Sequence, residues 1–169
     1  MFYQLLEFLG LYNTNANDTT NEETNNEKRS NEKLIINDTN DTNLDSRFYY
    51  LSLMFENNQW VIHGLWPQYS KTDYPQFCKK VTFNPDLLKP IEEELDKSWY
   101  SDRGDNDSFW EHEWQKHGSC FFKNINEFDY FNTTLQLYKK VKDMGIIDNY
   151  RNGNKSMIPF DLNLNLLNY

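Results

Sequence analysis

Apolar residues first form a continuous run over residues 48–55, where aromatic and branched side chains dominate. Such a run predicts a buried strand. Polar residues typical of a turn fill positions 56–59, and a second apolar run covers 60–63. We therefore predict a β-hairpin that places His63 at the end of its second strand, just before Gly64.

Helical patterns follow the hairpin. Asn84 and Pro85 predict a short helical turn, and Pro90 suits the first turn of a helix that runs to about Trp99. Residues 108–111 have the capping-box form Ser-x-x-Glu, which predicts that the next helix begins at Ser108. Gly118 suits the C-terminal cap of that helix.

The last part of the chain predicts one longer helix and one strand. An apolar stripe marks a helix over about 127–144, with Gly145 as its stop; its members are Phe128, Phe131, Leu135, Tyr138 and Val141. Alternating residues over 158–166 are typical of a strand. Strands and separate helices together predict an α+β domain in which an antiparallel sheet packs with several helices.

The composition divides the chain into two parts. Residues 12–46 are rich in Asn, Thr, Asp and Glu and cannot bury enough apolar surface, so residues 1–46 are predicted to be a disordered low-complexity segment. Residues 47–169 are expected to form one catalytic domain, shortened at its C-terminus. The formal net charge of −9 argues against broad electrostatic capture of nucleic acid. No segment is apolar enough to predict a membrane span.

The three histidines of the chain lie in two short blocks, 60–67 and 109–120. At about 100° per residue, the second block places a carboxylate, an ammonium, an aromatic ring and two imidazoles on one stripe of a helix. The stripe consists of Phe109, His112, Glu113, Lys116 and His117. An apolar core stripe would not carry four ionisable groups, so the stripe indicates a chemical site.

Two kinds of chemistry compete for this stripe. Zinc-binding helices use His-Glu-x-x-His, whereas His112 and His117 are five positions apart and Lys116 between them would repel a cation. The pattern fits phosphoryl transfer without metal better. Cleavage of RNA through its own 2′-hydroxyl needs a base, an acid and cations around the phosphorus.

The two blocks resemble the active-site signatures of the ribonuclease T2 family of acid, largely base-non-specific ribonucleases. The first signature, aromatic-x-Ile-His-Gly-Leu-Trp-Pro, matches 60–67. The second, Phe-Trp-x-His-Glu-Trp-x-Lys-His-Gly-x-Cys, matches 109–120. The resemblance extends over roughly residues 48–147 and implies a ribonuclease T2-like fold.

The resemblance implies a role for each matched side chain. His117 would be the general base on the 2′-hydroxyl, and His63 the general acid for the departing 5′-oxygen. His112 would hold the phosphate. Glu113 and Lys116 would stabilise the transition state. The product would be a 2′,3′-cyclic phosphate, hydrolysed slowly to a 3′-phosphate, at acidic pH and without a cofactor or a metal.

The resemblance also implies base-binding residues. Trp66 and Phe109 resemble the two aromatic platforms of the family, whose stacking is tolerant of base identity. Gln68 stands where some members have an acidic residue that contacts the base, and Tyr74 is a further candidate. Core packing is the alternative for Phe109 and Tyr74. Gly64 and Pro67 are expected to form turns rather than contacts.

Cys78 and Cys120 permit one disulfide, with two free thiols as the alternative from the residues alone. The family pairs the matching cysteines, so the resemblance implies the disulfide. A disulfide favours an extracytoplasmic compartment, although the first residues, with Glu7 and no basic segment, make a poor signal peptide.

The expected partner is single-stranded RNA, not DNA or a membrane, and the protein is expected to be a monomer. The first segment is shorter than in most members and lacks a Trp-Pro pair, so part of the second base site is expected to be missing. Two alternatives remain open. One is an impaired RNA-binding or host-interaction protein, and the other is a metalloenzyme that a chelator would inactivate.

Overall fold

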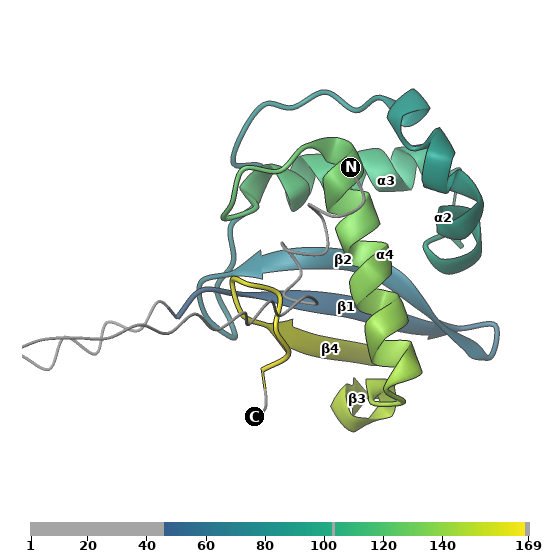
Figure 1. Ribbon diagram of the computed structural model, residues 1–169, viewed down its shortest axis with the longest axis vertical. Coiled ribbons are helices and arrows are strands. Elements are labelled where there is room, and N and C mark those ends of the chain that lie inside the picture. The colour runs from purple at the N-terminus through teal and green to yellow at the C-terminus, as the bar shows by residue number, and fades with distance from the viewer. Residues whose placement is uncertain (1–45, 103, 168–169) are drawn as a thin grey trace, which may run out of the picture. The chain divides into compact units, whose positions relative to one another are not determined.

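The computed structural model describes residues 46–102 and 104–167, and the low-complexity segment predicted over 1–46 lies outside them except for Ser46. The described strands form one antiparallel sheet in the order β2-β1-β4-β3 (Figure 1). They are β1 (Phe48–Glu56), β2 (Gln59–Gln68), β3 (Arg151–Asn152) and β4 (Lys155–Phe160). Helices pack with this sheet, so the predicted α+β class is confirmed.

The β1–β2 hairpin is the longest pairing in the sheet. Asn57 and Asn58 form its two-residue turn with φ angles of 49° and 63°, left-handed values that Asn adopts more readily than most residues. The two predicted strands and the turn between them are confirmed. However, β2 continues through Gln68, so the prediction that His63 ends the strand is wrong.

A register shift within the hairpin determines how His63 is presented. Leu53 pairs with Ile62, whereas the preceding Ser52 pairs with Gly64, so His63 is an extra residue on β2. Such a β-bulge bends the strand and redirects a side chain, and bulges are frequent next to active sites. His63 is therefore positioned by the mismatch between two strands rather than by the end of one.

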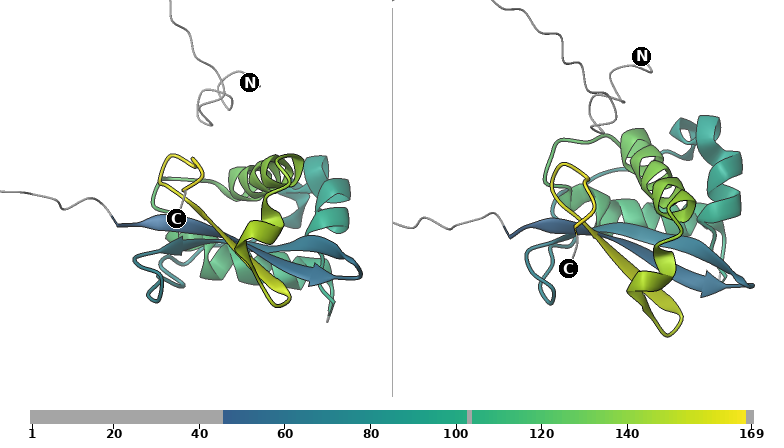
Figure 2. Two further views of the ribbon diagram at one scale, coloured as in Figure 1. Left: turned by 90° about the horizontal axis from the view of Figure 1, so that it is seen from below. Right: turned by 60° about the horizontal axis from the view of Figure 1, so that its bottom comes forward.

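Helix α4 (Glu127–Asp143) crosses one face of the sheet (Figures 1 and 2). The side chain of Asn126 caps its first turn, and Gly145 follows its end with a φ of +66°. Four members of the predicted apolar stripe are buried, namely Phe131, Leu135, Tyr138 and Val141; Phe128 is only partly buried. The hydroxyl of Tyr130 donates to the carbonyl of Leu65, which fixes the helix to β2.

Helix α3 (Asn106–Lys116) begins earlier than the capping-box pattern predicts. Asp105 is the N-cap, and its carboxylate accepts hydrogen bonds from both the backbone N–H and the hydroxyl of Ser108. The side chain of Ser108 is thus a partner of the cap and not the cap itself. Gly118 does not cap the C-terminus either, because His117 holds that position and Gly118 begins a 3₁₀ turn, Gly118–Cys120.

The segment before α3 contains the other predicted helix. Asn84 caps a 3₁₀ turn, Pro85–Leu87, and a second turn, Lys89–Ile91, leads into α2 (Glu92–Ser98). Trp99 ends α2, as predicted, and its side chain is fully buried. None of the helices in the described part of the chain combines the length and the apolar character that crossing a membrane requires.

Strand β4 confirms the predicted C-terminal strand but begins and ends earlier than residues 158–166. It lies on the opposite side of β1 from β2, so β1 is an interior strand. Ser156, Ile158 and Phe160 are fully buried, whereas Lys155 is exposed and Met157 partly so. This alternation shows that β4 presents Lys155 and Met157 on the face away from the core.

Candidate active site

The bulge residue His63 lies between two aromatic rings. Its ring centroid is 5.2 Å from that of Trp66 on the same strand and 5.6 Å from that of Phe109 on α3. The indole N–H of Trp99 donates to the backbone carbonyl of His63, 3.0 Å away, and this bond anchors the bulge to the end of α2. The side chain remains 39% exposed, so it can meet a ligand directly.

Glu113 lies beneath His63 and is almost completely buried, with 2% of its side chain exposed. Its Oε1 lies 3.9 Å from Nε2 of His63, and its Oε2 accepts a hydrogen bond of 2.9 Å from the indole N–H of Trp66. Burial raises the pKa of Glu113 to about 8, because the ionised form loses its hydration. The carboxyl group is therefore neutral in acidic solution.

Gly64 makes this arrangement possible. A Cβ at this position would clash with the carboxylate of Glu113 and with the indole of Trp66. The prediction that Gly64 and Pro67 form turns is wrong, because both residues lie within β2. The role of Gly64 is to let strand β2 and the side chain of Glu113 approach each other closely.

His117 follows the last residue of α3, and its imidazole stacks on the indole ring of Trp66. The two ring centroids are 4.9 Å apart at an interplanar angle of 21°. Only 2% of His117 is exposed, and its Nδ1 has no hydrogen-bond partner within the described residues. Burial, followed by the charge of Lys116, lowers the pKa of His117 to about 3, so the imidazole is neutral over most of the pH range.

His112 and Lys116 complete the predicted helical stripe. Burial and the neighbouring Lys116 lower the pKa of His112. The ring of Phe77 approaches His112 edge-on with a centroid distance of 6.1 Å. Lys116 also lowers the pKa of both His63 and His117, which indicates that its charge reaches all three imidazoles. The structure thus brings the five predicted catalytic side chains together, although His117 lies one residue beyond the helix.

Two cavities flank this cluster. The larger has a volume of about 460 Å³ and is lined by His63 and Phe109. The smaller, of about 240 Å³, is lined by His117 and Lys116 together with three predicted substrate-binding residues, Trp66, Gln68 and Tyr74. Each imidazole proposed for proton transfer therefore faces a cavity of its own.

The four predicted substrate-binding residues differ in exposure. Phe109 is partly exposed beside His63, and Tyr74 is 45% exposed, so neither is a core residue. Gln68 is 4% exposed, and its amide donates to the carbonyl of Trp66. Gln68 therefore helps to hold the end of β2 in addition to lining the smaller cavity.

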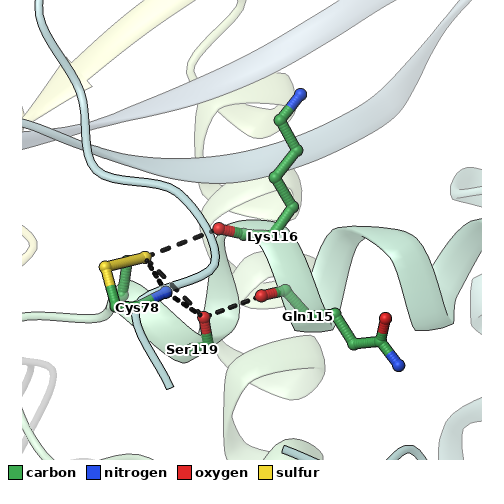
Figure 3. The surroundings of a disulfide bond; sticks show 5 residues. Cys78, Gln115, Lys116 and Ser119 are labelled. Atoms are coloured by element: carbon green, nitrogen blue, oxygen red, sulfur yellow. Dashed lines mark hydrogen bonds between the residues drawn. A yellow bond between two sulfur atoms is a disulfide. The ribbon is translucent and has the colours of Figure 1, made fainter. Parts of the chain in front are cut away.

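Cys78 and Cys120 form the expected disulfide, which fastens the loop before α2 to the end of α3 (Figure 3). Around it, the hydroxyl of Ser119 accepts from the backbone N–H of Cys78 and donates to the carbonyl of Gln115. The disulfide closes a loop across 42 positions, a length for which chain entropy predicts roughly 4 kcal/mol of stabilisation. It fixes the turn that immediately follows His117.

Several residues of the cavities were not predicted from the sequence. Met54 and Lys155 line the larger cavity, and Tyr50 and Met157 line the smaller one. The signal that could have identified them is the period-2 alternation of β1 and β4, which places these four side chains on the face opposite the core. That inference needed the pairing of β4 with β1, which the sequence does not show.

The described residues contain no group of three or more His, Cys, Asp or Glu side chains that could hold a metal ion. His63, His112 and His117 are accompanied by Lys116, whose charge opposes a bound cation. The same charge suits an anion with distributed negative charge, such as a phosphodiester.

A sequence model of the ribonuclease T2 family matches residues 49–152, which include both histidine blocks. The chain belongs to the ribonuclease T2 family. This finding confirms the resemblance drawn from residues 60–67 and 109–120.

Curated relatives match about half of the chain. Ribonuclease DdI of Dictyostelium discoideum is 40% identical over 85 residues, which are 49% of this chain and 38% of that protein. Ribonuclease 1 of Arabidopsis thaliana is 37% identical over 90 residues, 51% of this chain and 39% of that protein. The match thus spans less than half the length of either relative.

Solved structures of ribonuclease T2 proteins share the fold. The RNase-related protein from Calystegia sepium aligns with a TM-score of 0.57 and 20% identity, covering 73% of this chain and 90% of that one. RNase NT in complex with 5′-AMP aligns with a TM-score of 0.55 and 20% identity, covering 72% and 89%. At this identity the likeness supports the fold of residues 46–167.

Proposed function

We propose that this chain is a metal-independent endoribonuclease that cleaves single-stranded RNA by transesterification. The observation that carries the proposal is that the rings of His63 and His117 both contact the indole of Trp66 while each lines a separate cavity. A reaction that needs an acid and a base on opposite sides of a phosphorus fits this arrangement. Membership of the ribonuclease T2 family supports the same reaction.

His117 is the proposed general base. It takes the proton of the 2′-hydroxyl while the 2′-oxygen attacks phosphorus, and the 2′,3′-cyclic phosphate forms as the bond to the 5′-oxygen breaks. The low pKa of His117, about 3, keeps its imidazole neutral in acidic solution. An anionic phosphodiester bound beside the ring would raise this pKa and strengthen the base.

His63 is the proposed general acid, which donates its proton to the departing 5′-oxygen. Its exposed edge is suited to this step because a leaving nucleoside must pass it. In the second, slower reaction the roles reverse: His63 activates water, and His117 protonates the 2′-oxygen, giving a 3′-phosphate end. Burial lowers the pKa of His63, so its protonated form is abundant only in acidic solution.

Three further groups act on the phosphate in this proposal. His112 and Lys116 supply positive charge to the non-bridging oxygens as negative charge grows on them. Glu113, with a pKa of about 8, is neutral in acidic solution and can donate a hydrogen bond where a carboxylate would repel the phosphate. The indole N–H of Trp66 holds Glu113 in place.

Aromatic side chains provide for weak base preference. Trp66 and Tyr74 line the cavity of His117, and Phe109 lines the cavity of His63. Stacking on such rings tolerates every base, while Gln68 offers an amide for limited selection. RNase NT has been solved with 5′-AMP, and we propose that the aromatic cavities of this chain likewise accept nucleotides.

We further propose that the protein acts as a monomer on RNA and not DNA, because the reaction requires a 2′-hydroxyl. The disulfide is compatible with an oxidising compartment, so we propose an extracytoplasmic location. Residues 47–169 are proposed to be the catalytic domain and to need no cofactor.

The decisive experiment follows cleavage of an RNA dinucleotide between pH 4.5 and 7 with excess chelator. The expected product is a 2′,3′-cyclic phosphate, and the matching substrate with a 2′-deoxy upstream nucleoside should remain intact. A His117→Ala protein, purified identically, controls for contaminating ribonuclease. Binding of RNA by folded protein without turnover would reject the proposal and favour a non-catalytic RNA-binding role.

A further inference from the structure

Strand β4 carries a cation beside the proposed active site, and the role suggested for it rests on the proposed function. Met54 of β1 pairs with both Val61 of β2 and Lys155 of β4, so the three residues lie side by side across the sheet. Residues paired directly in an antiparallel sheet project from the same face. Val61, at one end of this row, is buried, whereas Lys155, at the other end, is exposed.

Lys155 therefore lies at the rim of the larger cavity, which His63 and Phe109 also line. Its charge is the second cause, after burial, of the lowered pKa of His63, so the ammonium group lies within electrostatic reach of that imidazole. The match to the ribonuclease T2 family ends at residue 152, before Lys155. The family signatures thus do not account for this cation.

The direction of the RNA chain determines what Lys155 would meet. His63 protonates the departing 5′-oxygen in the proposed reaction, so the cavity beside His63 and Phe109 receives the nucleoside downstream of the cleaved bond. The 3′-oxygen of that nucleoside carries the next phosphate of the RNA. A nucleoside bound in this way would direct this phosphate toward the rim of the cavity, which Lys155 lines.

We propose that Lys155 forms a phosphate subsite for the nucleotide downstream of the cleaved bond, so that RNA extending beyond that nucleoside is preferred over a dinucleotide. Glu56 and Asp102 line the same cavity and carry negative charge. Among the side chains that line this cavity, Lys155 supplies the ammonium group that would attract a second phosphate. Lys155 thus determines whether a longer chain is accepted.

Two substrates separate this subsite from the chemistry. ApA ends at the downstream nucleoside, and ApAp carries the additional 3′-phosphate. The wild-type chain is expected to cleave ApAp with a kcat/KM about five-fold higher than that for ApA, as a single exposed phosphate contact would provide. Lys155→Met should bring this ratio to about one, and Lys155→Arg should restore most of it.

Lys139→Met is the matched control, because Lys139 is exposed on α4 and lines neither cavity. It makes the same change of charge and should leave the ratio at the wild-type value. The salt dependence gives an independent measure: the slope of log KM for ApAp against log salt should fall by about 0.7 in Lys155→Met only. Equal ratios in wild-type and Lys155→Met proteins would overturn the subsite.

Failure of the proposed function would give a different result. If the wild-type chain cleaves neither substrate, binding of the uncleavable 2′-deoxy forms of ApA and ApAp still tests Lys155. Tighter binding of the 3′-phosphorylated form, lost in Lys155→Met and retained in Lys139→Met, supports the subsite without catalysis. Equal binding of both forms by the wild-type chain rejects it.

Discussion

His63 and His117 approach the same indole, Trp66, yet their surroundings differ in almost every respect. His63 is the extra residue of a strand bulge, is 39% exposed and faces a cavity with charged groups at its rim. His117 follows the end of a helix, is 2% exposed and is held by the disulfide-linked turn behind it.

The surroundings of the two histidines suit them to the two different roles proposed for them. Burial lowers the pKa of both imidazoles, but that of His117 falls to about 3, well below any ordinary histidine. The buried imidazole is neutral and can accept a proton, whereas the exposed one can still be protonated in acidic solution. The two environments thus suit the proposed assignment of His63 as the acid and His117 as the base.

The largest expected effects come from removing either histidine, and substrates with different leaving groups distinguish the two variants. His63→Ala and His117→Ala should each reduce cleavage of a dinucleotide by about 100-fold or more. A ribonucleoside 3′-(4-nitrophenyl phosphate) releases a phenolate that needs no protonation. His63→Ala should recover most of its rate on this substrate, and His117→Ala should not. Recovery by the His117 variant instead would reverse the assignment.

The pH profile of the wild-type chain sharpens the same contrast. The kcat/KM for a dinucleotide should rise as His117 loses its proton near pH 3 and fall as His63 loses its own, at a pKa below 6.5. Each limb should approach a ten-fold change per pH unit. With the nitrophenyl substrate the upper limb should disappear, because the acid is no longer needed. Persistence of that limb would show that His63 acts otherwise.

Glu113 lies close to His63 and accepts a hydrogen bond from Trp66, on which His117 stacks. Variants of Glu113 test whether its neutral form is the active one. At pH 5, Glu113→Gln should lose about ten-fold or less in activity, because an amide also donates a hydrogen bond. Glu113→Ala should lose more, since it leaves the indole N–H of Trp66 without its acceptor. A Gln variant as impaired as the Ala variant would argue for an essential carboxylate.

The raised pKa of Glu113 also makes the free energy of unfolding depend on pH. Its pKa is about 8 in the folded chain and near 4.5 when unfolded, so its neutral form stabilises the fold fully below pH 4.5, and this contribution is lost as pH rises to 8. Glu113→Gln should therefore gain stability relative to wild type at pH 8 but not at pH 4. Thermal unfolding at the two values measures this difference.

The smallest effects are expected from the aromatic side chains of the two cavities. Tyr74→Ala on the side of His117 and Phe109→Ala on the side of His63 should each raise KM for a dinucleotide by about five-fold. With the nitrophenyl substrate, which has no downstream base, only Tyr74→Ala should retain its effect. Equal effects of both variants on that substrate would mean that the cavities do not divide the two bases.

The sequence indicated which side chains form the candidate site better than it indicated how the backbone positions them. The stripe from Phe109 to His117 follows from helical periodicity, and the structure places Phe109 and Glu113 beside His63. The bulge at His63 was missed because it depends on how Ser52 and Leu53 pair with β2. Strand register is a property of two segments, which one segment's pattern cannot reveal.

The boundaries of α3 and β4 show a second limit. Ser108 fits a capping box, but Asp105 lies three residues earlier, and its carboxylate accepts a hydrogen bond from the backbone N–H of Ser108. Strand β4 begins before the predicted residue 158, and its Ser156 is fully buried, where its hydroxyl donates to the carbonyl of Ile147. Local polarity predicts burial poorly where a distant backbone group satisfies a hydroxyl.

The absence of a side chain at Gly64 has a consequence for anyone who would transplant this site into another protein. Copying the three histidines, Lys116 and Glu113 onto a new strand and helix would fail if the strand carried even an alanine opposite the carboxyl group. The scaffold must supply an empty volume as well as the reactive groups. A search for host proteins should therefore first select those with a strand that can carry glycine beside a bulge.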